Sequence, residues 1–398
     1  MSRRVTLTRT VTVPDRLRLA RHRRAPELGP RVLFFSGGSA LREASGRLTE
    51  YTHNSTHLIT PFDSGGSSAK LRDAFDMISV GDLRNRLMAL ADTRLQGHPE
   101  TYRLFGHRFP MDGDHAAHWS RLKEMVAGEH PLVDAIPNPM RRIICNHLSF
   151  FLAVAPPDFD LRGASVGNLI LTGGYLNQGR DMDAVTFTFS KLVEARGLVR
   201  PVVDAHCHLQ ATLADGRVVT GQHRLTGKEV PPLTSAISDL RLVRAEDPAI
   251  VADPEIDRGT RRFIETADLI CFPFGSYYTS VLACLLPRGV GRAVAEAGCA
   301  KVYVPNSGAD PEQIGLPVAD AVERLLAYLR RSGPGELPTE RLLDLVIVDS
   351  ARGQYPGGLD RARIERRGVR VLDLRLVTAR SRPFIDARRL VEVLVSLV

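Results

Sequence analysis

Cysteines, long apolar runs and the common nucleotide-binding motifs are all scarce or missing in this chain of 398 residues. The five cysteines are odd in number, scattered and never spaced Cys-x-x-Cys, which argues against a disulfide framework or a zinc site and is typical of a reducing cytosol. The most apolar stretch, 269–286, is interrupted by Pro273, Gly275 and hydroxyl residues, whereas a spanning helix needs about 20 nearly unbroken apolar residues. The opening Met1–Arg4 leads into alternating Thr and Val rather than the apolar block of a signal peptide. We therefore expect a cytoplasmic protein without a membrane partner.

The basic charge of the chain is concentrated at its start. The formal net charge is +8, and residues 1–30 carry eight arginines against Asp15 and Glu27, so this segment accounts for six of the eight excess charges. We predict a basic N-terminal arm over 1–30, with an edge strand or hairpin at Val5–Val13, ahead of a single domain over 31–398. A solvated arm is the simpler interpretation of such a segment, and nucleic acid is not the expected partner.

Strands alternate with helical patterns after Arg31. With 43% hydrophobic and 25% charged residues, the chain has the composition of a globular protein, neither disordered nor fibrous. The alternation predicts an α/β fold, a mostly parallel sheet with helices on both faces. A helical insertion is expected at about 101–160, and Asp215-Gly216 predicts a β-hairpin between arms at 199–213 and 217–224. The other predicted strands are 31–36, 57–62, 269–274, 301–306, 342–349 and 369–377, and the chain should close on a helix over 386–397.

Three predicted strands end in glycine and serine at the point where a helix begins. The loops are Gly37–Ser39, Gly65–Ser68 and Gly275–Ser280. Each arrangement directs backbone N–H groups and a helix N-terminus at one point, which suits a phosphate, and three on one sheet edge indicate a diphosphate or a nucleotide. None of the loops reads G-x-G-x-x-G or G-x-x-x-x-G-K-[ST], which disfavours a dinucleotide oxidoreductase and an ATP-hydrolysing motor.

Acidic and basic side chains accompany the second of these loops. Asp63 follows the second strand, where it can hold Mg²⁺ against phosphates, accept a proton from an attacking hydroxyl, or cap the turn. Asp82 is predicted to be the N-cap of the next helix. Arg84 and Asn85 lie one turn inside it, within reach of a ligand or in solvent. The segment Asp204–His208 is not expected to bind a metal, because His206 and His208 would share one face of a strand and Cys207 the other.

These motifs, in this order, resemble the 2-phospho-L-lactate transferase (CofD)/YvcK family, and the divergent CofD-related branch found beside ATP-grasp and kinase genes in bacteria. The resemblance runs from about Arg31 to the C-terminus. The motifs that carry it are Phe35–Ser39, Thr60–Ser68, Gly81–Asn85, Gly167–Leu169 and Gly275–Ser280.

The resemblance implies a Rossmann-like fold that holds a nucleotide diphosphate. Transferase members move a phospholactyl group from a guanosine-diphosphate-linked donor to a hydroxyl of the deazaflavin FO, with Mg²⁺. YvcK members bind UDP-sugars and act as regulators. The resemblance places Asp63 at the reacting end, as catalytic residue and Mg²⁺ ligand. We expect Arg84 to be the second catalytic residue, steadying charge nearby, with Asp82 and Asn85 on the acceptor side. Further residues are expected to bind the nucleotide and its phosphates, and they include three from the second glycine loop. They are Gly37, Gly38, Ser39, Gly65, Gly66, Ser67, Asn168, Gly275, Ser276, Tyr278, Thr279, Ser280 and Asn306.

The chain departs from the family pattern around the reacting end. Ser64 stands beside Asp63 where the family has a second carboxylate, and Arg84 takes the place of another acidic residue. The expected acceptor is FO or an analogue, and these departures add a different, anionic acceptor as an alternative. Two hypotheses follow: a transferase acting on a GDP- or UDP-linked donor, and a nucleotide-sugar sensor without a reaction. The expected partners are the nucleotide-linked small molecule, ATP-grasp and kinase pathway neighbours, and a second copy of the chain in a homodimer.

Overall fold

The computed structural model describes residues 10–92, 98–227, 229–333 and 335–398. The predicted strand Val5–Val13 therefore lies mostly outside the described residues. The described part of the basic arm forms helix α1 (Arg16–Arg24). Asp15 caps this helix by accepting a hydrogen bond from the Arg18 N–H. No helix of the described chain is long and apolar enough to cross a membrane.

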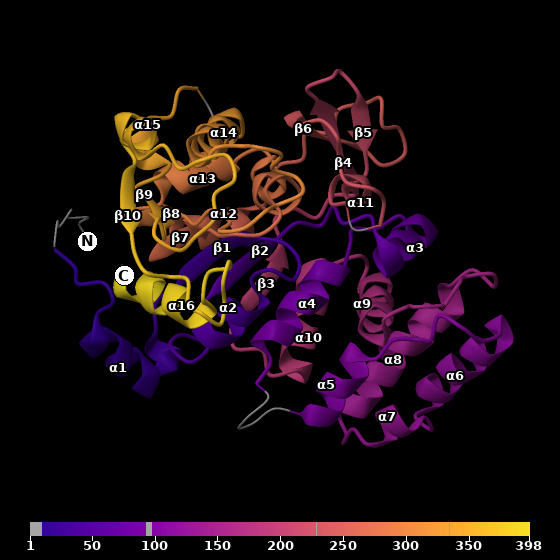
Figure 1. Cartoon of the computed structure of the whole chain (residues 1–398). Coiled ribbons are helices and arrows are strands. Elements are labelled where there is room, and N and C mark those ends of the chain that lie inside the picture. The colour runs from indigo at the N-terminus through magenta and orange to yellow at the C-terminus, as the bar shows by residue number, and fades with distance from the viewer. Residues whose placement is uncertain (1–9, 93–97, 228, 334) are drawn as a thin grey trace.

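A seven-stranded parallel sheet forms the centre of the molecule (Figure 1). Its neighbouring strands all pair in parallel, which confirms the predicted sheet. The strands, in order across the sheet, are β10 (Arg370–Asp373), β9 (Leu345–Val348), β8 (Ala300–Tyr303), β7 (Leu269–Phe272), β1 (Val32–Ser36), β2 (Thr56–Ile59) and β3 (Leu198–Pro201).

Helices cover both faces of this sheet, as predicted. Alternate residues of β1 point to opposite faces, so that Phe35 packs in one core and Phe34 in the other. Figure 1 shows the two helical layers on either side of the sheet. The first layer comprises α12 (Arg258–Glu265), α13 (Val290–Glu296), α14 (Val318–Arg331) and the turns η2 (Tyr277–Leu282) and η3 (Ala283–Leu285). The second comprises α1, α2 (Arg42–Leu48) and α16 (Ala387–Ser396). Shorter elements at the edges are η1 (Pro26–Leu28), η4 (Thr339–Arg341) and α15 (Arg361–Arg366).

A helical region with its own core lies beside the β2–β3 edge (Figure 1). It contains the predicted insertion and extends beyond it in both directions, because helices on either side bury their apolar faces in the same core. Its helices are α3 (Gly66–Phe75), α4 (Gly81–Leu90), α5 (Pro99–Gly106), α6 (His115–Ala127), α7 (Pro131–Asp134), α8 (Met140–Val154), α9 (Val166–Asn177) and α10 (Met182–Leu192).

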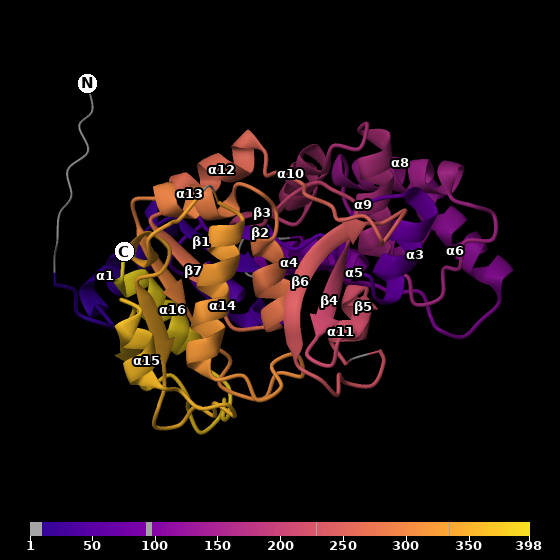
Figure 2. The same cartoon turned by 90° about the horizontal axis from the view of Figure 1, so that it is seen from above.

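A second, antiparallel sheet lies between α14 and the helical region (Figure 2). Its strands are β4 (Cys207–Leu213), β5 (Val218–Thr220) and β6 (Ile237–Arg244), and the short helix α11 (Gln222–Leu225) follows β5. The Asp215-Gly216 turn is present, with Gly216 at a φ of +85°. The single strand predicted over 199–213 is wrong: β3 pairs with β2, and the chain then leaves the large sheet before β4 pairs with β6.

We predict that Gly173→Ala is strongly destabilising. Gly173 of α9 packs against α8 so closely that an added Cβ would lie 1.9 Å from the His147 carbonyl oxygen. Overpacking of this kind costs about 1–3 kcal/mol or more in the free energy of unfolding, measured by chemical denaturation. The control is Gly298→Ala, since no atom lies within 4 Å of its added Cβ. Equal stabilities of the two variants would contradict this account of the α8–α9 contact.

Candidate functional site

A cleft of about 410 Å³ lies where β1, β2 and β7 end. Loops from the carboxyl ends of parallel strands meet at one sheet edge, and this is where ligands of such folds bind. The three glycine-serine loops all line the cleft. The predicted site residues that line it are Gly37, Gly38, Ser39, Asp63, Gly65, Gly66, Ser67, Asp82, Arg84, Asn85, Asn168, Gly275, Ser276 and Ser280.

The first and third loops are in direct contact. A Cβ added to Gly37 would lie 2.5 Å from Ser280 Oγ, so only glycine lets the two loops approach this closely. Gly275 has a φ of +140°, which favours glycine. A Cβ added to it would lie 3.5 Å from the Ala40 Cβ, so the third loop also approaches the chain that follows the first loop. The two loops therefore form one continuous wall.

The second loop is fixed from two sides. Asn168, near the start of α9, donates from Nδ2 to Ser67 Oγ at 3.0 Å. On the other side Gly81 begins α4, and an added Cβ there would lie 2.5 Å from Ser68 Oγ and 3.4 Å from Asp63 Oδ2. Helices α3, α4 and α9 thus all begin beside the cleft, with the positive ends of their dipoles toward it.

The fully buried Arg86 of α4 holds the first loop from behind. Its guanidinium donates from Nη2 to the carbonyl oxygens of Gly37 at 3.0 Å and Gly38 at 3.4 Å, and from Nη1 to Ser45 Oγ. With these carbonyls turned away from the cleft, the N–H groups of Gly37, Gly38 and Ser39 have no recorded acceptor among the described residues. Sequence reasoning missed Arg86, although its place between Leu83 and Leu90 on the apolar face of α4 indicates burial.

Two further buried arginines flank the other loops. Arg72 of α3 is 1% exposed and donates to the carbonyl oxygens of Asp63 at 3.0 Å and Cys207 at 2.6 Å. Arg84 is 6% exposed and donates to Ser165 Oγ at 2.6 Å and to the side-chain oxygen of Asn85 at 2.6 Å.

The hydrogen bonds recorded for these three guanidinium groups all go to uncharged acceptors. Burial lowers the pKa of all three, and lowers the pKa of Arg84 and of Arg86 to about 10, so that each remains charged at neutral pH. Arg42 and Arg108 lower the pKa of Arg84 further, while Asp82 attracts both Arg84 and Arg86. The Nε atoms of all three are buried without a partner. Buried charges are normally paired, so this wall of the cleft favours an anionic ligand.

Three predicted nucleotide contacts lie behind the cleft instead of lining it. The N–H groups of Tyr278 and Thr279 and the Thr279 hydroxyl all donate to the buried carboxylate of Glu312, which occupies the position expected for a phosphate. The Tyr278 hydroxyl donates to the Ile237 carbonyl oxygen. Burial and the neighbouring Asp310 raise the pKa of Glu312.

Asn306 is the third of these residues. Its Oδ1 accepts from the Gly275 N–H at 2.9 Å and its Nδ2 donates to the Gly275 carbonyl oxygen at 2.7 Å. Asn306 therefore positions the third loop. That loop faces the cleft with Gly275, Ser276 and Ser280, and the predicted use of its helical N–H groups does not match the structure, because acidic side chains already accept from them.

The acidic side chains of the cleft are few. Asp63 both lines the cleft and caps its own turn, accepting from the Gly65 N–H at 3.1 Å. Asp82 is not the N-cap of α4: Val80 is, and Asp82 lies in the first turn with its carboxylate 3.4 Å from an ideal Cβ on Gly38. The described residues contain no group of three or more His, Cys, Asp or Glu side chains placed to hold a metal ion. A Mg²⁺ bound by Asp63 would thus need phosphate oxygens of the ligand as further ligands.

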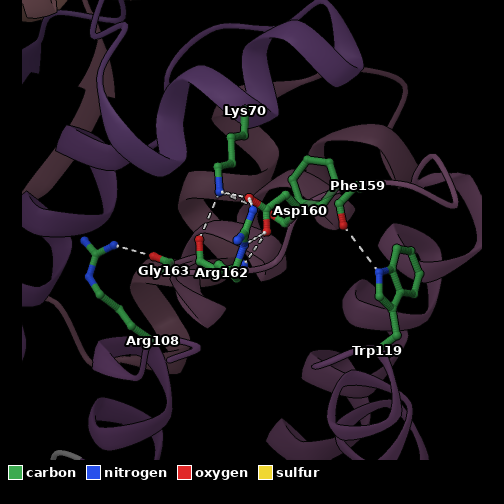
Figure 3. A network of polar contacts seen from close by, with 7 residues as sticks. All are labelled: Lys70, Arg108, Trp119, Phe159, Asp160, Arg162 and Gly163. Atoms are coloured by element: carbon green, nitrogen blue, oxygen red, sulfur yellow. Dashed lines mark hydrogen bonds and ion pairs between the residues drawn. The ribbon is translucent and has the colours of Figure 1, made fainter. Parts of the chain in front are cut away.

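Other cleft residues come from the helical region and from the segment that follows β5 of the small sheet. No local sequence motif predicts a role for them. Arg108 lines the cleft and donates to the Gly163 carbonyl oxygen at 3.0 Å (Figure 3). Close by, Lys70 of α3 donates to Asp160 at 2.8 Å, which ties α3 to the segment before α9 (Figure 3). From the small sheet come Gln222, His223, Thr226 and Glu229.

His206 and His208 do not line the cleft. His206 contacts Asp76 through Nδ1, and Arg72 lies 3.3 Å from His208 Nδ1. Burial and Arg72 lower the pKa of His208 to about 4.

Comparisons with known proteins agree with this fold. Residues 32–377 match the family described as 2-phospho-L-lactate transferase CofD. The chain is 29% identical over 360 residues to the gluconeogenesis factor of Bacillus subtilis, covering 88% of this chain and 92% of that protein. A relative from Nostoc sp. is 28% identical over 367 residues, and the match spans 89% of this chain but only 65% of the Nostoc protein. The crystal structure of a UPF0052-family protein from Bacillus halodurans has the same fold, with a TM-score of 0.66 and 23% identity over 92% of this chain and 98% of that one.

We predict that Thr279→Val lowers the free energy of unfolding by about 1.5–3 kcal/mol, because it removes a buried hydrogen bond to the Glu312 carboxylate without changing the side-chain volume much. Ser276→Ala, at a cleft-facing hydroxyl of the same loop, should stay within about 0.5 kcal/mol of the parent. Denaturant unfolding measures both. A Thr279→Val variant as stable as the parent would show that Thr279 does not support Glu312.

Proposed function

The chain belongs to the 2-phospho-L-lactate transferase CofD family, and from that premise we propose that it transfers a phosphoester group from a nucleotide-diphosphate-linked donor to an acceptor hydroxyl. The observation that carries the proposal is the set of three buried arginines, Arg72, Arg84 and Arg86, whose hydrogen bonds go to uncharged acceptors around a cleft of glycine loops. A diphosphate would add an anionic partner for these cations beyond the neighbouring carboxylates Asp63 and Asp82.

The donor's diphosphate is expected against the first loop. Across their trans peptide bonds, the N–H groups of Gly38 and Ser39 point away from the Gly37 and Gly38 carbonyls that Arg86 holds. Ser276 and Ser280 add hydroxyl donors from the third loop. Hydrogen-bond donors that are already in place before the ligand binds can stabilise negative charge on a transferring phosphoryl group, because the loops do not have to rearrange during the reaction.

The reaction needs positioning and charge neutralisation more than covalent catalysis. Asp63 would ligate Mg²⁺ together with the diphosphate, or take the proton of the acceptor hydroxyl. Mg²⁺ would neutralise charge on the phosphates when bound. Arg84, which lies near the further cations Arg42 and Arg108, would steady negative charge beside them and favour an anionic acceptor.

The second candidate function is a nucleotide-sugar sensor that binds the same ligand without reaction. The relative from Bacillus subtilis is named for gluconeogenesis rather than for a transfer reaction. The scarcity of carboxylates around Asp63 also favours this candidate, since a sensor does not need a full metal site.

A ligand panel and a product assay separate the two functions. We expect GDP, GTP or a UDP-sugar to raise the melting temperature, because a ligand that binds only the folded state stabilises it. For a transferase, the matching donor should then release nucleoside monophosphate when an acceptor is added, and Asp63→Asn should keep nucleotide affinity but lose turnover. Binding without release supports the sensor. A turnover unchanged in Asp63→Asn removes Asp63 from the mechanism.

We also predict that Arg84→Met weakens binding of the nucleoside diphosphate about tenfold or more, because the substitution removes a positive charge from a wall shielded from solvent. Isothermal titration calorimetry measures the affinity. The matched control is Arg103→Met on α5, an exposed arginine paired with Glu100. Equal affinities of the two variants would exclude Arg84 from anion binding.

A further inference from the structure

The small antiparallel sheet brings a histidine into the cleft opposite the glycine loops. His223 lies in α11, directly after β5, and among the described residues that line the cleft it is the one histidine. Its ring contacts Ser64 of the second loop, 159 residues earlier in the chain. Figure 1 shows the two elements that meet here, α11 of the small sheet and the start of α3.

Ser64 holds the imidazole in one orientation. Ser64 Oγ lies 2.9 Å from His223 Nδ1 and also accepts from the His223 backbone N–H at 3.4 Å. A hydroxyl oxygen has two lone pairs, so it can accept from both groups when the ring carries its hydrogen on Nδ1. We assign this tautomer, which leaves the lone pair of Nε2 to accept a proton on a residue that lines the cleft. Gly221, at a φ of +103°, makes room for the ring, since its added Cβ would lie 3.0 Å from His223 Cε1.

The carboxylates that line the cleft, Asp63, Asp82 and Glu229, already have other neighbours. Asp63 accepts from the Gly65 N–H and is attracted to Arg72, and Asp82 is attracted to both Arg84 and Arg86. Glu229 Oε1 lies against the second loop, 2.6 Å from an ideal Cβ on Gly65. Imidazole, by contrast, is the side chain whose proton exchange suits reactions near neutral pH.

We propose that His223, oriented by Ser64, accepts the proton of the acceptor hydroxyl, an inference that rests on the proposed transferase function. The acceptor oxygen forms a bond to the phosphorus that carries the transferred group, and its proton moves to His223 Nε2. The bond from that phosphorus to the bridging oxygen breaks, and nucleoside monophosphate leaves with the electron pair. The imidazolium then returns its proton to the leaving phosphate or to water. Ser64 is a positioning residue in this scheme, and Asp63 remains available for Mg²⁺.

His223→Gln and His223→Ala test this role in the full-length protein. The assay follows release of guanosine monophosphate from a donor in which lactate is esterified to guanosine diphosphate, with Mg²⁺ and with FO or a deproteinised bacterial extract as the acceptor. We expect turnover of both variants to fall about 10²–10⁴-fold, the usual contribution of a proton-transfer group. The dissociation constant for GDP or UDP should stay within about twofold of the parent. Free imidazole should restore part of the turnover of His223→Ala, an effect that a merely structural role would not produce.

Two further variants sharpen the test. His206→Gln changes a histidine next to β4 that contacts Asp76 outside the cleft, and it should turn over like the parent. Ser64→Ala should lower kcat with little change in KM, and Ser64→Thr, which keeps the hydroxyl, should recover most of the rate.

The outcomes separate the two proposals. Normal turnover of His223→Gln in an active parent overturns the role of His223 and leaves the transferase standing. Loss of nucleotide binding in that variant overturns it too, because His223 would then be a binding residue. A parent that binds nucleotide but releases no monophosphate with either acceptor overturns the transferase, and the proton-accepting role with it.

Discussion

The hydrogen bonds from buried arginines to loop carbonyls are the constraint on which the cleft depends. Arg86 binds the carbonyl oxygens of Gly37 and Gly38, and Arg72 binds that of Asp63. A glycine-rich loop has many conformations of similar energy, and burying a cation against its carbonyls selects the one that presents N–H groups to the cleft. The same burial is costly, since a guanidinium taken out of water loses its hydration. A concentration of buried charge beside a cleft is typical of functional sites.

The third loop is organised by the opposite charge. Glu312 and Asp310 accept from the N–H groups at the start of η2, and Asn306 clamps Gly275 from both sides. The loop therefore keeps its shape without a ligand, and only its cleft-facing hydroxyls remain for binding. The two sides of the cleft thus differ in kind: one is held by buried cations and attracts anions, and the other is preformed by acidic side chains behind it.

The remaining walls come from parts of the chain that a minimal α/β sheet does not need. The helical region contributes Arg108 and Asn168, and the small sheet contributes His223 and Glu229. The sheet edge alone provides a phosphate site of a kind found in many folds, whereas these added parts face whatever is attached to the diphosphate. Differences between an enzyme and a sensor built on this fold are therefore expected in these walls rather than in the glycine loops.

The sequence by itself determined the parallel sheet, the helices on its two faces and the glycine loops at one edge. Those features follow from local periodicity and from the rule that parallel strands end on the same side, and most of the predicted site residues line one cleft as a result. Only the tertiary structure decided which groups of those loops are available. Thr279 and Tyr278 match the pattern of a phosphate loop, but Glu312, more than 30 residues away, occupies their N–H groups. Arg86 and His223 belong to no motif, because their roles arise from contacts with residues 49 and 159 positions away, and spacing along a chain does not encode such contacts.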